Sequence, residues 1–284
     1  MSSTLRLLWF VPSPVALAAD AWGLTPGVSL QAERNPSSDA QFEALASGRA
    51  DAVLTAIDNV MDWNLRDGPQ DFCVVAQLER TTPLTVIGQR GRDRLEDLRG
   101  ATILVDAPRN GFIVALRAML ADAGIEPDDY ALEPVGGVKE RHDAIVSGHG
   151  DATLLGPPFD AMALDAGLSR VATVQERYPT FPGQGLVVSA GALERLRPTL
   201  SAWLQGLDKA RWRMSDDPEG ARQILALAGF SAPVVDAMLR GTPASLRPDR
   251  DGIELLIQQR RRCGLPGADT TYDRLVNTSA LPQD

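Results

Sequence analysis

Short apolar runs alternate with amphipathic stretches along the first part of the chain, and this alternation carries the main structural signal. The apolar runs predict strands at residues 5–10, 28–34, 52–55, 101–106, 130–135 and 152–155. The stretches between them predict helices, of which the clearest are residues 15–23, 110–123 and 138–146. From about residue 190 onward only helical patterns remain, near residues 196–214, 218–228 and 251–263. Strands that alternate with helices imply crossover connections and largely parallel sheets, so we expect an α/β fold.

One unit of this pattern occurs twice. The stretch "EALASGRADAVLTAIDN" at residues 43–59 aligns with "DAIVSGHGDATLLGPPF" at residues 143–159, with Ser, Gly and Asp at matching positions. Each copy is typical of a helix that ends at a Ser-Gly pair, because glycine readily takes the left-handed conformation that closes a helix. A turn and a short buried strand follow. Two copies at this spacing predict two similar lobes rather than one continuous sheet.

The first residues, "MSSTLRLLWFVPSPVALAADAWGL", allow two interpretations. Arg6, the apolar run after it and the later "ALA" are typical of a secretory signal. The same run can be a buried strand that leads into a "VPSP" loop and then a helix. Pro12 and Pro14 interrupt the run that a signal would want helical, which weighs against a signal.

Composition excludes several classes of function. The 284-residue chain has a formal net charge of −9, whereas a nucleic-acid-binding protein needs a basic face. No window reaches the roughly 20 consecutive apolar residues that span a bilayer, so we expect no membrane insertion. Cys73 and Cys263 lie far apart, and no cluster of His, Cys and acidic residues has metal-ligand spacing. We therefore expect no metal and no cofactor.

The predicted strand order locates a ligand-binding cleft. In open α/β sheets, ligands bind beyond the carboxyl ends of the strands. The corresponding loops are residues 11–14, 35–38 and 55–59 in the first lobe, and 106–110 and 155–159 in the second. Facing lobes would bring these loops together around one concave site. The candidate ligand-binding residues are Pro12, Ser13, Ser37, Ser38, Thr55, Asp58, Asn59, Arg109, Asn110, Gly156, Pro157 and Phe159.

Two of these candidates are charged, and each has an alternative role. Arg109 precedes a helix, where it could clamp a carboxylate or sulfonate, or could be solvated. Asp58 could accept from a ligand amine, or could cap the helix that begins at "NVMDWN". We expect the two to face each other across the cleft. His142 and His149 lie on a helix and at the remote end of a strand, so neither is expected to act in the site.

The motifs "FEALASGRADAVLTA", "DLRGATILVD" and "RHDAIVSGHGDATLL" resemble the periplasmic-binding-protein-like type II superfamily. The similar branch binds sulfonates (SsuA-like), nitrate, taurine and pyrimidine precursors. The resemblance implies two α/β lobes, each a mostly parallel sheet flanked by helices, with a ligand cleft between them. It also implies crossings near residues 84–88 and 185–188. One lobe would then comprise residues 1–87 and 186–284, and the other residues 88–185.

The same resemblance implies a function. The main hypothesis is that the protein binds a small anionic or aromatic organic molecule, as the substrate-binding proteins of ABC transporters do. The alternative is a cofactor-independent enzyme of the lyase or decarboxylase type that uses the same cleft, so the sequence leaves enzymatic activity open. In exported members of this superfamily a signal precedes the first strand, so the resemblance implies that the first apolar run is the strand itself. We therefore expect no processing at the N-terminus and a cytoplasmic protein. A removed leader would instead make it periplasmic, with an ABC permease as its partner.

Overall fold

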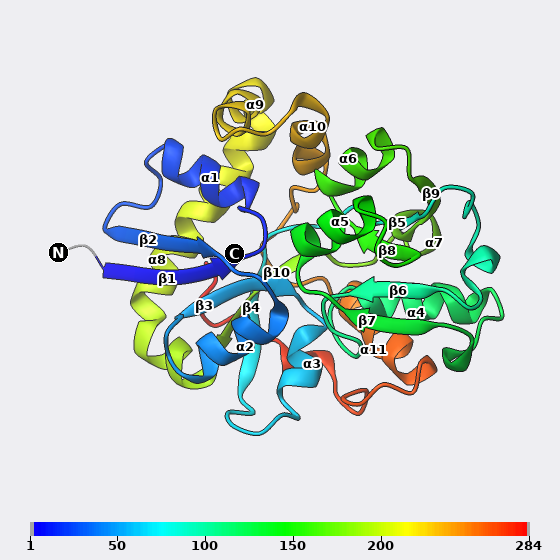
Figure 1. The fold of residues 1–284 in the computed structure, drawn as a ribbon. Helices are drawn as coiled ribbons and strands as arrows, with labels where there is room; N and C mark the ends of the chain where they lie inside the picture. The colour runs from blue at the N-terminus through cyan, green and yellow to red at the C-terminus, as the bar shows by residue number, and fades with distance from the viewer. Residues whose placement is uncertain (1–2, 283–284) are drawn as a thin grey trace.

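Residues 3–282 of the computed structural model form two five-stranded sheets that lie side by side, each flanked by helices (Figure 1). Sheet A has the order β2 (Val28–Arg34), β1 (Ser3–Trp9), β3 (Ala52–Ala56), β10 (Gln184–Ser189) and β4 (Phe72–Gln77). Sheet B has the order β7 (Ala131–Pro134), β6 (Thr102–Val105), β8 (Ala152–Leu155), β5 (Thr85–Gly88) and β9 (Ser169–Thr173). In each sheet three strands run parallel, and one strand inserts antiparallel between two others. The two-lobed α/β fold is therefore confirmed.

Helices cover both sheets. Those that follow strands of sheet A are α1 (Pro14–Ala21), α2 (Ser38–Ala46), α3 (Asn59–Trp63), α8 (Ala190–Asp216), α9 (Pro218–Leu227) and α10 (Ala232–Arg240). Those that follow strands of sheet B are α4 (Ile113–Asp122), α5 (Val138–Val146), α6 (Phe159–Asp165) and α7 (Val174–Arg177). Short 3₁₀ turns occupy Leu95–Leu98 and Pro127–Asp129. Near the C-terminus, α11 (Arg250–Arg262) packs against α4, and α12 (Tyr272–Leu275) packs against β4. Within residues 3–282, no helix has the length and hydropathy that a bilayer span requires.

The repeated unit forms the same helix–turn–strand piece once in each sheet, as α2–β3 and as α5–β8. Gly48 and Gly148 take positive φ values of 71° and 86° at the ends of their helices. The shared aspartates also act alike. The Asp51 carboxylate accepts from the backbone N–H of Arg6 on β1, and that of Asp151 accepts from the N–H of Thr102 on β6. The repeated "SG…DA" pattern therefore ends a helix and joins the following strand to its parallel neighbour.

The apolar run near the N-terminus forms β1, which lies between β2 and β3. Leu5 and Leu7 on this strand are almost fully buried, and Leu7 pairs with Ala52 in β3. The run then meets Pro14 at the start of α1, where proline costs no backbone hydrogen bond. The residues that resemble a signal thus supply an internal strand of the fold.

The chain crosses between the sheets twice. It leaves sheet A after β4 and enters sheet B at β5, and it returns after α7 to β10. The crossings expected at residues 84–88 and 185–188 coincide with β5 and β10, which are strands within the sheets. An apolar run alone does not distinguish a sheet strand from a connection. We propose that residues 78–84 and 178–183 are the connecting segments, which moves each predicted lobe boundary by several residues.

One hydrophobic core runs through both lobes. It joins Val53 and Val187 of sheet A to Ile103 and Leu154 of sheet B, with Leu256 of α11 in the same cluster. A second cluster lies under α1 and α8 on sheet A alone. The packing of α11 places C-terminal residues next to both sheets, close to the site described below.

Candidate functional site

A cavity of about 130 Å³ lies between the two sheets at the predicted strand ends. A cavity of similar volume holds benzene in another protein, so a small organic molecule fits. Apolar side chains form most of the wall, including Phe10, Leu84, Phe112, Ile113 and Met238. They come from the end of β1, the first crossing, the start of α4 and α10. The cavity is therefore built from both lobes and from the connections between them.

Polar side chains occupy restricted parts of this wall. The charged ones among the described residues are Glu79, Asp106 and Arg141. The uncharged ones are Asn59, Thr81, Thr82, Asn110 and Gln184. Glu79 lies in the first connecting segment and Gln184 is the first residue of β10, directly after the second, whereas Asp106 and Arg141 belong to the second lobe.

Glu79 is a half-buried carboxylate with neutral partners. The Thr82 hydroxyl donates to its Oε2 at 2.5 Å, and the Gln184 amide donates to its Oε1 at 3.0 Å. Burial raises the pKa of Glu79 above its usual value, because these hydrogen bonds only partly offset the loss of hydration. Gln184 is 6% exposed, and its Oε1 has no hydrogen-bond partner among the described residues.

Asp106 and Arg141 lie on the opposite lobe from α2. Both carboxylate oxygens of Asp106 accept from the backbone N–H of Ser38, at 3.2 and 3.1 Å, which links the two lobes. Arg141, on α5, donates to the backbone carbonyls of Gly136 and Leu154 at 2.9 and 3.1 Å. Its buried Nε has no partner within residues 3–282. Burial raises the pKa of Asp106 and lowers that of Arg141.

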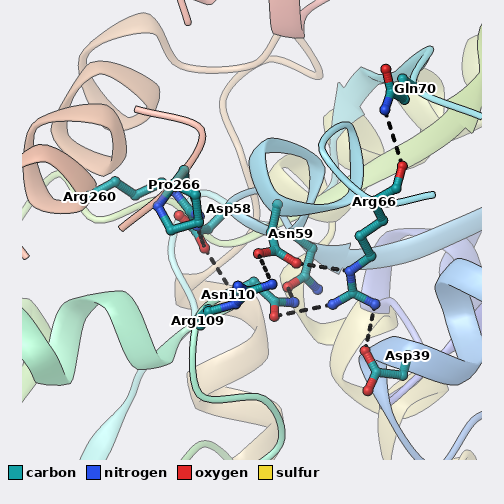
Figure 2. A network of polar contacts seen from close by, with 11 residues as sticks. Asp39, Asp58, Asn59, Arg66, Gln70, Arg109, Asn110, Arg260 and Pro266 are labelled. Atoms are coloured by element: carbon teal, nitrogen blue, oxygen red, sulfur yellow. Dashed lines mark hydrogen bonds and ion pairs between the residues drawn. The ribbon is translucent and has the colours of Figure 1, made fainter. Parts of the chain in front are cut away.

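Asn59 and Asn110 are predicted site residues that the fold brings together. The Asn110 amide donates to Asn59 Oδ1 at 2.7 Å, and the Asn59 amide donates to the Thr55 hydroxyl at 2.7 Å. Asn110 follows β6 and Asn59 follows β3, so this contact joins the lobes. Figure 2 shows Arg66 beside the pair, with its side chain also directed at Asp39. Both asparagines line the cavity.

The expected opposition of Asp58 and Arg109 across the cleft is wrong. Asp58 is 1% exposed and does not line the cavity, and its Oδ2 accepts from Arg260 Nη1 at 2.7 Å and from the Gly111 N–H at 2.9 Å. It does not cap α3 either, because its carboxylate is turned toward α11. Figure 2 shows Arg260 reaching Asp58 from that helix. Burial raises the pKa of Asp58 to about 6 against the opposing effect of Arg260.

Arg109 points away from the cavity. Its side chain is 61% exposed, and its Nη2 lies 3.6 Å from Asp62 Oδ1. Of the two roles considered for Arg109, an anion clamp or a solvated side chain, its position fits the solvated side chain. Asp58 and Arg109 were chosen because they lie at strand ends, but a strand end fixes the backbone and leaves the direction of the side chain open.

The remaining predicted site residues have varied positions. Gly156 and Pro157 line the cavity at the end of β8. Ser13 and Ser37 cap α1 and α2 through their hydroxyls, at 3.4 and 3.1 Å from the N–H groups of Ala16 and Ala40. Four others are outside the lining. The Thr55 hydroxyl accepts from the Asn59 amide, and the Ser38 N–H donates to the Asp106 carboxylate. Phe159 packs against His142, and Pro12 lies in the loop before α1. Ligand contact by any of these residues stays a prediction.

The histidines lie outside the cavity lining, as expected. His142 is buried on α5, with its ring beside Phe159 and its Nδ1 3.0 Å from Asp143. His149 is exposed and lies 2.7 Å from Glu133. The described residues also contain no group of three or more His, Cys, Asp and Glu side chains that could hold a metal ion.

Sequence reasoning missed Glu79, Asp106, Arg141 and Gln184. Asp106 lies at the end of a predicted strand and could have been found by the rule that selected Asn110. Arg141 lies one turn into a helix, beyond the loop that was considered. Glu79 lies in a connecting segment and Gln184 at the start of β10, so a rule based on the carboxyl ends of strands covers neither.

Comparison with known proteins agrees with this geometry. The family model described as ABC transporter, phosphonate, periplasmic substrate-binding protein matches residues 23–237, most of the chain. A search of curated protein sequences gave no match. The lyase alternative and the cytoplasmic location find no support, because the family is a periplasmic family of substrate-binding proteins.

Solved structures with the same fold cover almost the whole chain. The alkanesulfonate-binding protein SsuA from Xanthomonas axonopodis pv. citri, bound to MOPS, is 18% identical with a TM-score of 0.76, and each chain is covered to 100%. The periplasmic nitrate-binding protein NrtA from Synechocystis PCC 6803 is 12% identical with a TM-score of 0.76, covering 98% of this chain and 87% of the other. The CA3427 gene product of Candida albicans is 12% identical with a TM-score of 0.80, covering 99% and 98%. These likenesses show the shared fold. Together with the family match, they show that the chain is a small-molecule-binding protein that belongs to the phosphonate family of periplasmic ABC-transporter substrate-binding proteins.

Proposed function

We propose that this protein binds a small organic molecule with an anionic group in the cavity between its lobes, and delivers it in the periplasm to an ABC permease. The family match supports transport, and the ligands for which the family and two similar proteins are named are phosphonate, alkanesulfonate and nitrate. The observation that carries the anionic part is Arg141 in the cavity wall.

Arg141 is suited to an anion because its charge lacks a carboxylate in direct contact. Two of its nitrogens donate to backbone carbonyls, which hold the guanidinium in place, and the carboxylates of Asp106 and Glu140 act on its charge without a direct contact. No ion pair within 4.0 Å involves Arg141 among the described residues, and its Nε is an unused donor. An arginine in such a place can bind a phosphonate, sulfonate or carboxylate with charge-assisted hydrogen bonds.

Two helices add to this attraction. The first residues of α4 and α5 contribute Ile113 and Val138 to the wall, and neither helix has a side-chain cap. Uncapped N–H groups and the helix dipole favour negative charge at such a helix start. We propose that the anionic group lies near Arg141 and these helix starts, with Asn59, Asn110, Gly156 and Pro157 around the ligand.

The lobes are already in contact around the cavity, which supports enclosure of the ligand. The Gly137 N–H donates to the Pro36 carbonyl at 2.7 Å, and Arg34 pairs with Glu140 at 2.8 Å. Both contacts join the end of β2 in one lobe to α5 in the other. A ligand that touches both lobes would favour this closed arrangement over an open one.

The test is a thermal-shift screen followed by calorimetric titration. Ethylphosphonate, ethanesulfonate and nitrate form the panel, and we expect at least one to raise the melting temperature. Arg141→Met should weaken binding of that compound about ten- to a hundredfold, corresponding to about 1.5–3 kcal/mol for one charge-assisted contact. Arg141→Lys, which keeps the charge, guards against a folding defect. Arg170→Met, on the exposed edge of β9, is the matched control and should bind like the parent. Equal affinity of parent and Arg141→Met would contradict the proposal.

A further inference from the structure

The N–H groups at the start of α2 are bound by the protein's own side chains. The Ser37 hydroxyl accepts from the Ala40 N–H at 3.1 Å, and both carboxylate oxygens of Asp106 accept from the Ser38 N–H at 3.2 and 3.1 Å. Asp106 follows β6 in the other lobe, so this carboxylate reaches the helix across the lobe boundary. Free N–H groups and the helix dipole favour negative charge at a helix start. Asp106 therefore occupies a position that would otherwise attract an anion.

Asp106 also separates this helix start from the cavity. It belongs to the cavity wall, whereas Ser38 is 1% exposed and lies outside the lining. Burial raises the pKa of Asp106, and the Ser38 hydroxyl, the nearby charge of Arg141 and the Ser38 N–H act in the opposite direction. These neighbours favour the charged carboxylate, which gives the wall a negative group on the side of α2.

The other charges of the wall match one anionic group on a ligand. Arg141 is its cationic side chain among the described residues, against the carboxylates of Glu79 and Asp106. An anionic group at Arg141 meets the guanidinium and the starts of α4 and α5. A second anionic group on the same molecule would face a carboxylate instead, within a wall formed mainly by apolar side chains. Like charges repel strongly in such surroundings, and a buried charge without compensation is costly.

We propose that Asp106 is a specificity-determining residue. It takes the place of an anionic group at the start of α2, and it thereby restricts the ligand to a single anionic group, which lies at Arg141. The part of the ligand that faces α2 is then uncharged. A repulsive group of this kind is a common source of specificity, because it penalises the wrong ligand. The anion at Arg141 rests on the function proposed above, whereas the position of Asp106 at α2 rests on contacts within the chain itself.

The experiment uses pairs of compounds that have the same shape and differ in one distal charge. These are phosphonoacetate with phosphonoacetamide, and sulfoacetate with its amide, measured by calorimetric titration. The parent should bind the amide of at least one pair about tenfold or more tightly than the carboxylate. Asp106→Asn, which removes the charge and keeps the shape, should bring the two affinities within about twofold of each other or favour the carboxylate. A looser lobe contact would weaken both compounds equally, so the ratio separates specificity from a structural role.

A second arm tests the start of α2 with sulfate and without Arg141. Sulfate is compared with chloride at equal ionic strength, in Arg141→Met and in the double variant with Asp106→Ala. The melting temperature should rise more with sulfate in the double variant, because the Ser38 N–H is then open to an anion. Asp128→Asn is the control for the calorimetric pairs. It lies exposed in the 3₁₀ turn Pro127–Asp129 of the same lobe, and it should keep the parental ratio.

Three results would overturn the role of Asp106. These are equal binding within both pairs by the parent, an unchanged preference for the amide in Asp106→Asn, and no additional effect of sulfate in the double variant. Failure of the proposed function has a different signature. If Arg141→Met binds the amides like the parent while the preference still depends on Asp106, the anion is not at Arg141 and the role of Asp106 stands. If the parent binds none of the four compounds, the sulfate arm decides whether Asp106 fills an anion position at α2.

Discussion

Asp58 and Arg260 form a buried ion pair whose partners are 1% and 0% exposed in their side chains. Removing one member should cost far more than the pair contributes, because the other charge would stay buried without compensation. We expect Arg260→Met to lower the free energy of unfolding by about 3–5 kcal/mol. Chemical denaturation measures this. Arg261→Met, on the exposed side of the same helix, should stay close to the parent.

The deficit of Arg260→Met should also depend on pH. The folded-state pKa of Asp58 is raised to about 6 from 3.8, and loss of Arg260 should raise it further. Near pH 5 the carboxyl is largely protonated in both proteins, whereas near pH 8 the variant must bury a charge or hold a proton. The difference in unfolding free energy should therefore grow from pH 5 to pH 8. A deficit independent of pH would show that Asp58 does not titrate in this range.

Substitution of Glu79 should raise the stability of the protein, whereas substitution of Arg260 should lower it. The folded-state pKa of Glu79 is raised, so its ionised form destabilises the ligand-free protein, and stability increases as the pH falls through that pKa toward the lower unfolded-state value. We expect Glu79→Gln to raise the melting temperature of the ligand-free protein at pH 8, with a smaller difference at pH 5. Differential scanning fluorimetry at the two values checks this, with Glu194→Gln as control. A lower melting temperature at pH 8 would mark Glu79 as a structural residue.

At the level of elements, the lobes are joined at a rim, which is the contact of Pro36 after β2 with Gly137 at the start of α5. Gly137 has φ −64° and ψ −175°, which alanine can adopt, but a Cβ there would lie 2.8 Å from the Pro36 carbonyl oxygen and 3.0 Å from Phe10. Gly137→Ala should therefore push the lobes apart without straining its own backbone. Overpacking of this kind typically costs about 1–3 kcal/mol.

We expect Gly137→Ala to weaken binding of the best compound in the panel by roughly tenfold, consistent with that cost. Its radius of gyration with ligand, measured by small-angle X-ray scattering, should exceed that of the ligand-bound parent. Gly191→Ala is the control, because a Cβ at Gly191 meets nothing within 4 Å. Identical scattering and affinity for Gly137→Ala and the parent would show that this rim does not limit closure.

Helices and strands could be predicted from the sequence where the local pattern of residues determines them. The repeat gave both helix–turn–strand pieces, because Gly48 and Gly148 end their helices through backbone conformation that the sequence displays. The run at β1 was likewise found by its apolar residues. The crossings stay a prediction, since the residues of β5 and β10 are equally apolar whether a strand joins a sheet or connects two lobes.

The site was less predictable because its contacts are distant in sequence. Asp58 pairs with a residue 202 positions away, and Glu79 meets Gln184 105 positions away. Strand-end reasoning pointed to the region where the cavity lies, and it selected Asn59, Asn110, Gly156 and Pro157 from the cavity wall. It could not choose which charged side chains turn inward, because that depends on packing against α11 and on the path of the crossings.

At the scale of the whole molecule, the lobes are joined by more than their two connections. The core that includes Val53 of sheet A and Ile103 of sheet B continues to Leu256 of α11. Arg262 of the same helix pairs with Asp122 of α4, on the side of sheet B. Such continuity implies that neither lobe can lose its packing without exposing apolar surface of the other.

We therefore expect the two lobes to unfold in one cooperative transition, and the tryptophans offer a direct test. All five lie outside residues 88–185, at Trp9, Trp22, Trp63, Trp203 and Trp212, so their fluorescence reports on the lobe of sheet A, whereas far-ultraviolet circular dichroism reports on both lobes. The two signals should give the same midpoint in guanidinium. Leu256→Ala, which leaves a cavity at the shared core, should lower both midpoints together, with a loss of about 2–5 kcal/mol. A dichroism transition that separates from the fluorescence transition, in the parent, would mean that the lobe of sheet B unfolds independently and that the continuous core does not couple the two.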